Sequence, residues 1–98
     1  MTVYQFRATV TTLSGATSST SLSVRGGVCR QVIVQANTSS TVFRANLTDA
    51  SGLNIMDYGL NTGEFNDVTG IPMAGRYVFN ITNASPDDTF KIYFAVEE

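Results

Sequence analysis

GRYVFNIT, residues 75–82, and TFKIYFAV, residues 89–96, alternate apolar with polar side chains. The apolar positions are Tyr77, Phe79 and Ile81 in the first stretch, and Phe90, Ile92, Phe94 and Val96 in the second. Such alternation is typical of strands that bury one face and expose the other. The segment between them, residues 83–88, contains Asn, Ser, Pro and Asp, which favour turns. The pattern therefore predicts an antiparallel hairpin and a β-sheet protein.

Further short strands are predicted at residues 4–10, 22–24, 28–36, 42–47 and 53–55. In the third of these, Val32, Ile33 and Val34 break strict alternation, which indicates a central strand covered on both faces. Gly26 and Gly27 permit a bulge, a turn or the close approach of another backbone. No stretch shows apolar residues at helical spacing. The 98 residues thus predict a single all-β domain, an antiparallel two-sheet β-sandwich or jelly roll, with a small closed β-barrel as the alternative.

Two segments lack a strand pattern. Residues 11–21 are low in complexity, being mostly Ser, Thr, Ala and Gly around Leu13, and we expect a loop or an arm there. Residues 57–70 contain three glycines, and their apolar residues follow neither the period of two of a strand nor the period of 3.6 of a helix. This pattern predicts an irregular loop. Long loops in compact domains often carry function or contact a partner.

The composition leaves few groups for catalysis. The chain has no histidine, one cysteine and one lysine, so most side chains that build catalytic centres and transition-metal sites are missing. Asp87 and Asp88 match no compact calcium loop and are better explained as turn residues. Cys29 has no partner for an internal disulfide and is expected to be a buried, inert thiol. We therefore expect no enzyme activity, no metal and no cofactor.

The charges point away from nucleic acid and membranes and towards protein partners. A net charge of −2 without a basic cluster gives little attraction to either polyanion. Five of the six basic residues are arginine, which is favoured at protein interfaces. The alternative is that these arginines are isolated charges that discourage edge-to-edge aggregation of strands. The predicted partner-contact residues are Arg7, Arg25, Arg44, Arg76, Leu13, Tyr58 and Phe65.

Residues 72–79, PMAGRYVF, resemble the turn followed by Gly-x-Tyr-x-Phe that occurs in carbohydrate-binding modules, adhesins and viral proteins of sandwich or jelly-roll fold. As a short, Ser/Thr-rich, histidine-free β chain, the protein is similar to the small structural proteins of tailed bacteriophages, with capsid decoration or cement proteins as the nearest comparison. This resemblance implies a non-enzymatic virion subunit, assembled in the host cytoplasm. It also implies a homo-oligomer, for example a trimer, that binds a major capsid or tail protein.

Two hypotheses for function follow. The first is a virion protein that binds and stabilises the coat, or alternatively a neck or tail subunit, through residues 11–21, residues 57–70 and outward arginines. The second is a carbohydrate-binding or adhesin-type module that stacks sugars on Tyr4, Tyr58 or Tyr93. The absence of tryptophan weighs against the second hypothesis.

Overall fold

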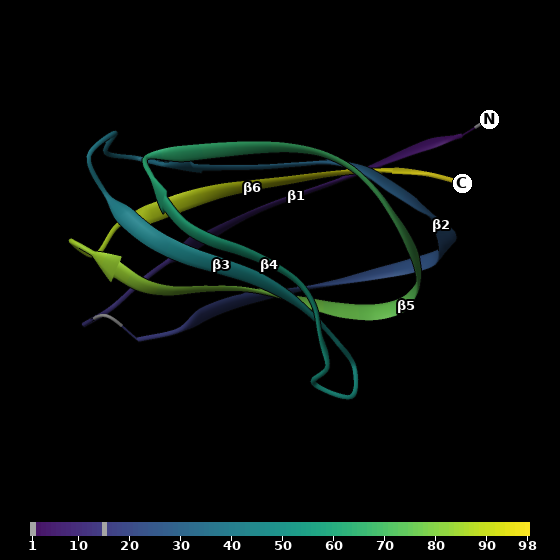
Figure 1. The fold of residues 1–98 in the computed structure, drawn as a ribbon, viewed down its shortest axis with the longest axis horizontal. Helices are drawn as coiled ribbons and strands as arrows, with labels where there is room; N and C mark the ends of the chain where they lie inside the picture. The colour runs from purple at the N-terminus through teal and green to yellow at the C-terminus, as the bar shows by residue number, and fades with distance from the viewer. Residues whose placement is uncertain (1, 15) are drawn as a thin grey trace.

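The computed structural model describes residues 2–14 and 16–98 of the protein and shows an all-β, antiparallel fold (Figure 1). Its strands are β1 (Val3–Thr11), β2 (Ser18–Ala36), β3 (Val42–Asp49), β4 (Asn54–Thr62), β5 (Glu64–Ser85) and β6 (Thr89–Glu97). They hydrogen-bond in the order β1-β6-β2-β5-β3-β4, and this order ends at β1 and β4 without closing. The prediction of an all-β sandwich is confirmed, and the closed-barrel alternative is wrong.

Two long strands pass through both layers of the sandwich. β2 has 19 residues and β5 has 22, and they pair with each other on both sides of a bulge between Val24 and Gly27. Beyond the bulge, β2 also pairs with β6, whereas the second half of β5 pairs with β3. Figure 1 shows both strands bending at the same end of the molecule. The first layer therefore consists of β1, β6, the second half of β2 and the first half of β5. The second layer consists of the other two halves with β3 and β4.

Glycines occupy the bend. Gly75 lies opposite Val24 and has a φ of 100°, a backbone conformation that residues with a Cβ rarely adopt. Gly27 allows the carboxyl end of β6 to come close, because a Cβ on Gly27 would lie 2.5 Å from the carbonyl oxygen of Glu97. The predicted bulge or close approach at residues 26–27 is thus confirmed.

The core lies between the layers and is rich in phenylalanine. Phe43 and Phe79 from the second layer, and Phe90 and Phe94 from the first, are fully buried. Their rings meet across the interface, with centroids 4.9 Å apart for Phe43 and Phe90 and 5.4 Å apart for Phe79 and Phe94. Edge-to-face contacts of this kind add to the free energy gained from burying the rings.

The hairpin predicted for residues 75–96 is wrong. Both strands form with the predicted faces buried, but β5 pairs with β2 and β3, whereas β6 pairs with β1 and β2. The turn residues 86–88 carry the chain from one layer to the other, so that Phe79 faces Phe94 across the core. Alternation identifies the buried face of a strand, and it does not identify the neighbour at its edge.

The irregular loop predicted for residues 57–70 is also wrong. β4 and β5 cover this segment and meet at Gly63, whose φ is 75° and whose missing Cβ makes room for the carbonyl of Ser39. Both strands lie at sheet edges there, where polar residues obscure the alternation. Of the predicted segment 11–21, β1 includes Thr11 and β2 begins at Ser18, while Gly15, like Met1, lies outside the described residues. Within the described ranges, no helix has the length and apolar character needed to cross a membrane.

Candidate binding face

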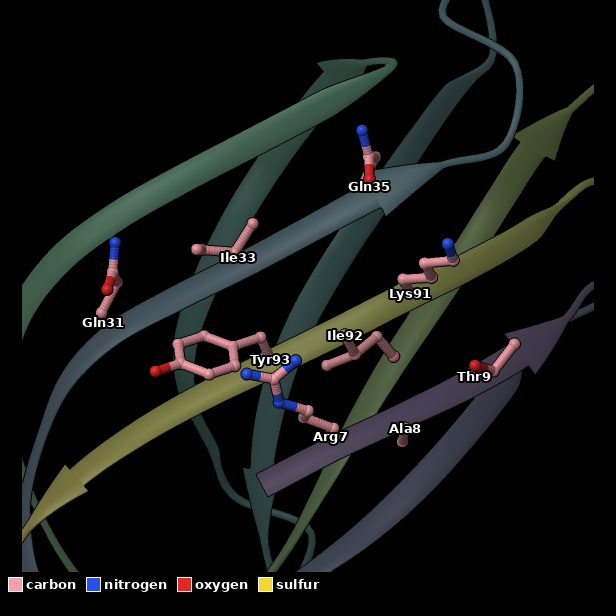
Figure 2. A pocket seen from close by; sticks show the side chains of 9 residues that line it. All are labelled: Arg7, Ala8, Thr9, Gln31, Ile33, Gln35, Lys91, Ile92 and Tyr93. Carbon is pink, nitrogen blue, oxygen red and sulfur yellow. The ribbon is translucent and has the colours of Figure 1, made fainter. Parts of the chain in front are cut away.

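The outer surface of the first layer has a hollow of about 730 Å³ (Figure 2). We call it the outer-face hollow, and it is lined by Arg7, Ala8 and Thr9 of β1, Gln31, Ile33 and Gln35 of β2, and Lys91, Ile92 and Tyr93 of β6. Ile92 is buried in the core, so its side chain lies on the other side of the sheet. The surface of the hollow is therefore formed mainly by the odd-numbered residues of three adjacent strands.

Strand register explains why these side chains meet. In each strand successive side chains alternate between the two faces of the sheet. The pairing places Arg7 opposite Tyr93, and Tyr93 opposite Ile33, so that one row crosses all three strands. Lys91 lies in the neighbouring row, opposite Thr9 on one side and Gln35 on the other. The hollow is thus a property of the β-sheet and does not depend on a loop.

The centre of the hollow combines an aromatic ring, an aliphatic side chain and a cation. The guanidinium carbon of Arg7 lies 5.2 Å from the centroid of the Tyr93 ring, which is a cation–π contact worth about 0.5–1 kcal/mol at an exposed site. Ile33 and Tyr93 are each half-buried. At the side facing β5, the amide of Gln31 donates to the side-chain oxygen of Asn66 at 3.0 Å.

The electrostatics of the hollow favour acidic groups. Arg7 and Lys91 are both exposed, and none of the nine described residues that line the hollow is acidic. In water, exposed charges such as these attract an opposite charge only weakly. The attraction becomes stronger when a binding partner excludes water from the surface. The surface therefore suits a partner that offers carboxylates around an apolar centre.

The structure brings only one of the predicted contact residues into the hollow. Arg7 lies there, whereas Arg25, Arg44 and Arg76 are exposed on the bend of β2, on β3 and on β5. Leu13 is 72% exposed in the connection between β1 and β2. The structure does not gather these residues into one site.

Tyr58 and Phe65 belong to the margin of the core. Their rings stack with centroids 5.0 Å apart, and Tyr58 also contacts Phe79. Burial raises the pKa of the Tyr58 phenol, with a further contribution from the neighbouring Cys29 and Asp67. The ring of Tyr58 is therefore already packed against the protein, and Tyr93 has Arg7 over its face. Both observations weaken the sugar-stacking hypothesis.

Sequence reasoning missed Ile33, Gln31 and Gln35 as surface residues of the hollow. The sequence signal for an apolar residue on the outer face is at residues 32–34, where three β-branched residues in a row break the alternation. A run of this kind predicts burial on both faces. Val32 and Val34 are indeed fully buried, whereas Ile33 is half-buried on the outer face.

Comparison with known proteins supports the fold and leaves the family open. Neither a known protein family nor a curated protein sequence matches the chain. The chain is similar to PliG of Aeromonas hydrophila, a periplasmic inhibitor of g-type lysozyme, with a TM-score of 0.53 and 14% identity over 97% of this chain and 86% of that one. It also aligns with infectious bursal disease virus, Gt strain, at a TM-score of 0.37 and 14% identity, over 97% of this chain and 31% of that one. The first likeness shows a shared fold, and the second is too low to support an argument.

Proposed function

We propose that the protein is a non-enzymatic structural subunit of a tailed-phage virion, a decoration or cement protein that binds the coat through its outer-face hollow. A neck or tail position is the alternative. The observation that supports binding is the row of Arg7, Tyr93 and Ile33 on a regular sheet face. The assignment to a virion rests on the resemblance in composition and β-strand pattern.

The chemistry of the hollow fits a protein interface. Tyrosine and arginine are enriched where one protein binds another, and they carry much of the binding free energy when a partner desolvates them. Here strand pairing fixes the backbone beneath them, so little backbone conformational entropy is lost on binding. Lys91 adds a second positive charge beside this centre. We expect the partner surface to present aspartate or glutamate.

The test measures the protein in purified particles of the phage that encodes it. Mass spectrometry should detect the chain at a fixed ratio to the coat protein. Binding of added protein to particles that lack it should then fall by about tenfold for Lys91→Glu and for Tyr93→Ala, which corresponds to about 1.4 kcal/mol. Arg44→Glu is the matched control, because it reverses one exposed charge on β3 and should change binding less than about threefold.

Two results would contradict the proposal. Absence of the chain from purified particles would exclude a virion role. Equal loss of binding for Lys91→Glu and Arg44→Glu would show that net charge matters and that the hollow does not. Circular dichroism of each variant would show that the β-sheet is retained.

The likeness to the Aeromonas inhibitor suggests a second candidate, a protein that binds and inhibits a lysozyme. The observation that favours it is the shared fold over 97% of the chain. Addition of the purified protein to a g-type lysozyme in a cell-wall lysis assay would test it. Inhibition at micromolar concentration would support this function, and full lysozyme activity at 100 µM protein, about a hundred times that level, would exclude it.

A further inference from the structure

The free edge of β1 lacks the bulges, prolines and inward charges that usually prevent a strand from pairing with another chain, and its one charged residue is the outward Arg7. β1 pairs with β6 through nine successive residues without a register shift, and it contains neither glycine nor proline. By contrast, the pairing of β4 with β3 has two register shifts. The first half of β5 contains Gly70 and Pro72, and its Asp67 lies opposite the buried Val32. Bulges, prolines and inward charges are devices that protect sheet edges.

Two backbone hydrogen bonds show which backbone groups of β1 face outward from the sheet. Glu98 N–H donates to the carbonyl of Thr2 at 2.9 Å, and Thr12 N–H donates to the carbonyl of Asp88 at 3.0 Å. Because hydrogen-bonded and non-hydrogen-bonded pairs alternate in antiparallel strands, the even-numbered residues of β1 bond to β6. The N–H and C=O groups of Val3, Gln5, Arg7 and Thr9 therefore point away from β6, to the free edge.

One end of this edge is closed and the other is open. The carbonyl of Thr11 points the same way as those four and accepts a hydrogen bond from the Ser18 hydroxyl at 2.9 Å. Towards the amino end, Tyr4 is 40% exposed although alternation directs it to the interior. A second hollow, of about 400 Å³, lies beside Tyr4 and is also lined by Ser23, Val24 and Arg25 of β2. The sandwich interior is thus incompletely covered around Tyr4.

We infer that β1 pairs in antiparallel fashion with β1 of a second copy of this chain. The resulting two-fold dimer joins the two first layers into one continuous sheet. This edge shares Arg7 and Thr9 with the outer-face hollow but uses their backbone groups and not their side chains, and the inference does not depend on the proposed function. A second copy is the occupant that fits, because in one antiparallel register the outward backbone groups of Val3, Gln5, Arg7 and Thr9 in both copies all find partners.

That register places Phe6 opposite Phe6 of the second copy. Gln5 then faces Arg7 of the second copy at the positions that exchange backbone hydrogen bonds, and Tyr4 faces Ala8 of the second copy at the closer positions. Aromatic pairs across strands stabilise such contacts, and the added strand extends cover over Tyr4 and Phe6. Shifting the register towards the carboxyl end would place Arg7 against Arg7, which like-charge repulsion disfavours. Moving it further in that direction would require the carbonyl of Thr11, which Ser18 already occupies. Shifting it towards the amino end would place Gln5 against Gln5 and leave the outward groups of Thr9 without a partner among the described residues.

Amide hydrogen exchange by NMR, with sedimentation equilibrium on the same samples, tests this pairing. We expect a dimer in which the amides of Gln5, Arg7 and Thr9 are protected. On dilution to monomer their exchange should accelerate at least tenfold, while the amides of Phe6 and Ala8, which bond to β6, keep their protection. A monomer at millimolar concentration would overturn the inference. So would any oligomer, including a trimer, in which Gln5, Arg7 and Thr9 exchange as fast as exposed amides.

A proline substitution separates edge pairing from other causes. Gln5→Pro removes an N–H that faces the free edge and spares the bonds between β1 and β6. Gln5→Ala is the matched control, because it shortens the same side chain and keeps the N–H. We expect Gln5→Pro to be a folded monomer and Gln5→Ala to remain a dimer. A dimeric Gln5→Pro would overturn the inference, and if that variant fails to fold, the exchange pattern of the natural sequence decides.

Discussion

Asp88 ties together three chain connections at one end of the sandwich. Its carboxylate accepts hydrogen bonds from the N–H of Thr38 at 2.9 Å, the hydroxyl of Thr41 at 2.8 Å and the N–H of Thr89 at 2.8 Å. Its own N–H donates to the hydroxyl of Thr12 at 3.0 Å. One aspartate thus joins the β1–β2, β2–β3 and β5–β6 connections, which explains why a turn residue is ordered where the chain crosses between layers.

These hydrogen bonds make the stability of the fold sensitive to acid. Partial burial opposes ionisation, but the hydrogen bonds from Thr41, Thr38 and Thr89 outweigh it and lower the pKa of the carboxyl below its ordinary value of 3.8. A lowered pKa in the folded state means that the unfolded state takes up the proton more readily. The stabilisation is therefore present above about pH 4 and is lost as the pH falls through the folded-state pKa.

We expect Asp88→Asn to reduce the free energy of unfolding at pH 7 and to make its decline between pH 5 and pH 2 shallower. Urea unfolding at several pH values measures both effects. Some acid sensitivity should remain, because hydrogen bonds from Ser51 and Leu53 lower the pKa of Asp49 as well. Glu64→Gln, which removes an exposed carboxylate, is the control. Parallel pH curves for Asp88→Asn and the natural sequence would contradict this account.

At the scale of elements, the bend in β2 and β5 determines the two layers. Gly75 and Gly26 both lie at this bend, and a Cβ added to either would meet no atom within 4 Å. They differ in backbone conformation, because only Gly75 has a positive φ, of 100°. The two glycines therefore form a matched pair in which steric contact is equal and backbone strain is not.

We predict that Gly75→Ala lowers the free energy of unfolding by about 1–2 kcal/mol, because alanine is strained at positive φ. Gly26→Ala should be neutral or stabilise the protein by up to about 1 kcal/mol through the entropy of the unfolded chain. Chemical denaturation of both variants measures the difference. Equal effects would show that the bend does not depend on the conformation of Gly75.

The sequence predicted the strands better than their neighbours. Alternation at Tyr77, Phe79 and Ile81 correctly identified a buried face, because every second side chain of a strand points to the same face of the sheet. It could not show that this strand pairs with β2 and β3, because backbone hydrogen bonds are the same for any partner. Turn residues between two strands suggested a hairpin, and the chain crosses the core instead.

Only part of the candidate site could be predicted, because alternation shows which face a side chain occupies and does not show which strands lie beside it. Arg7 was identified as a contact residue, and Tyr93 as an exposed aromatic, from their places in alternating strands. Their meeting with Ile33 depends on the pairing of β1, β6 and β2, whose residues lie far apart in the sequence. Register between distant strands is a tertiary property, and short-range pattern does not encode it.

At the scale of the whole molecule, the fold depends on pairing between distant segments. Val3 lies opposite Glu97, and β2 pairs with β5 across the intervening β3 and β4. Closing such long loops costs entropy before the contacts form, so folding is slow compared with that of helical proteins. Stopped-flow dilution from urea should show refolding in about milliseconds to seconds. Complete refolding within about 100 µs would contradict this topology.

The pairing of β1 with β6 has one more consequence. Thr2 and Glu98 are joined by a backbone hydrogen bond, so both ends of the described chain leave the sandwich together (Figure 1). A few linking residues would turn the polypeptide into a ring, and opening that ring at the Ala50 turn would leave each strand with its present neighbours. A chain that began in the β3–β4 connection could therefore form the same sheet.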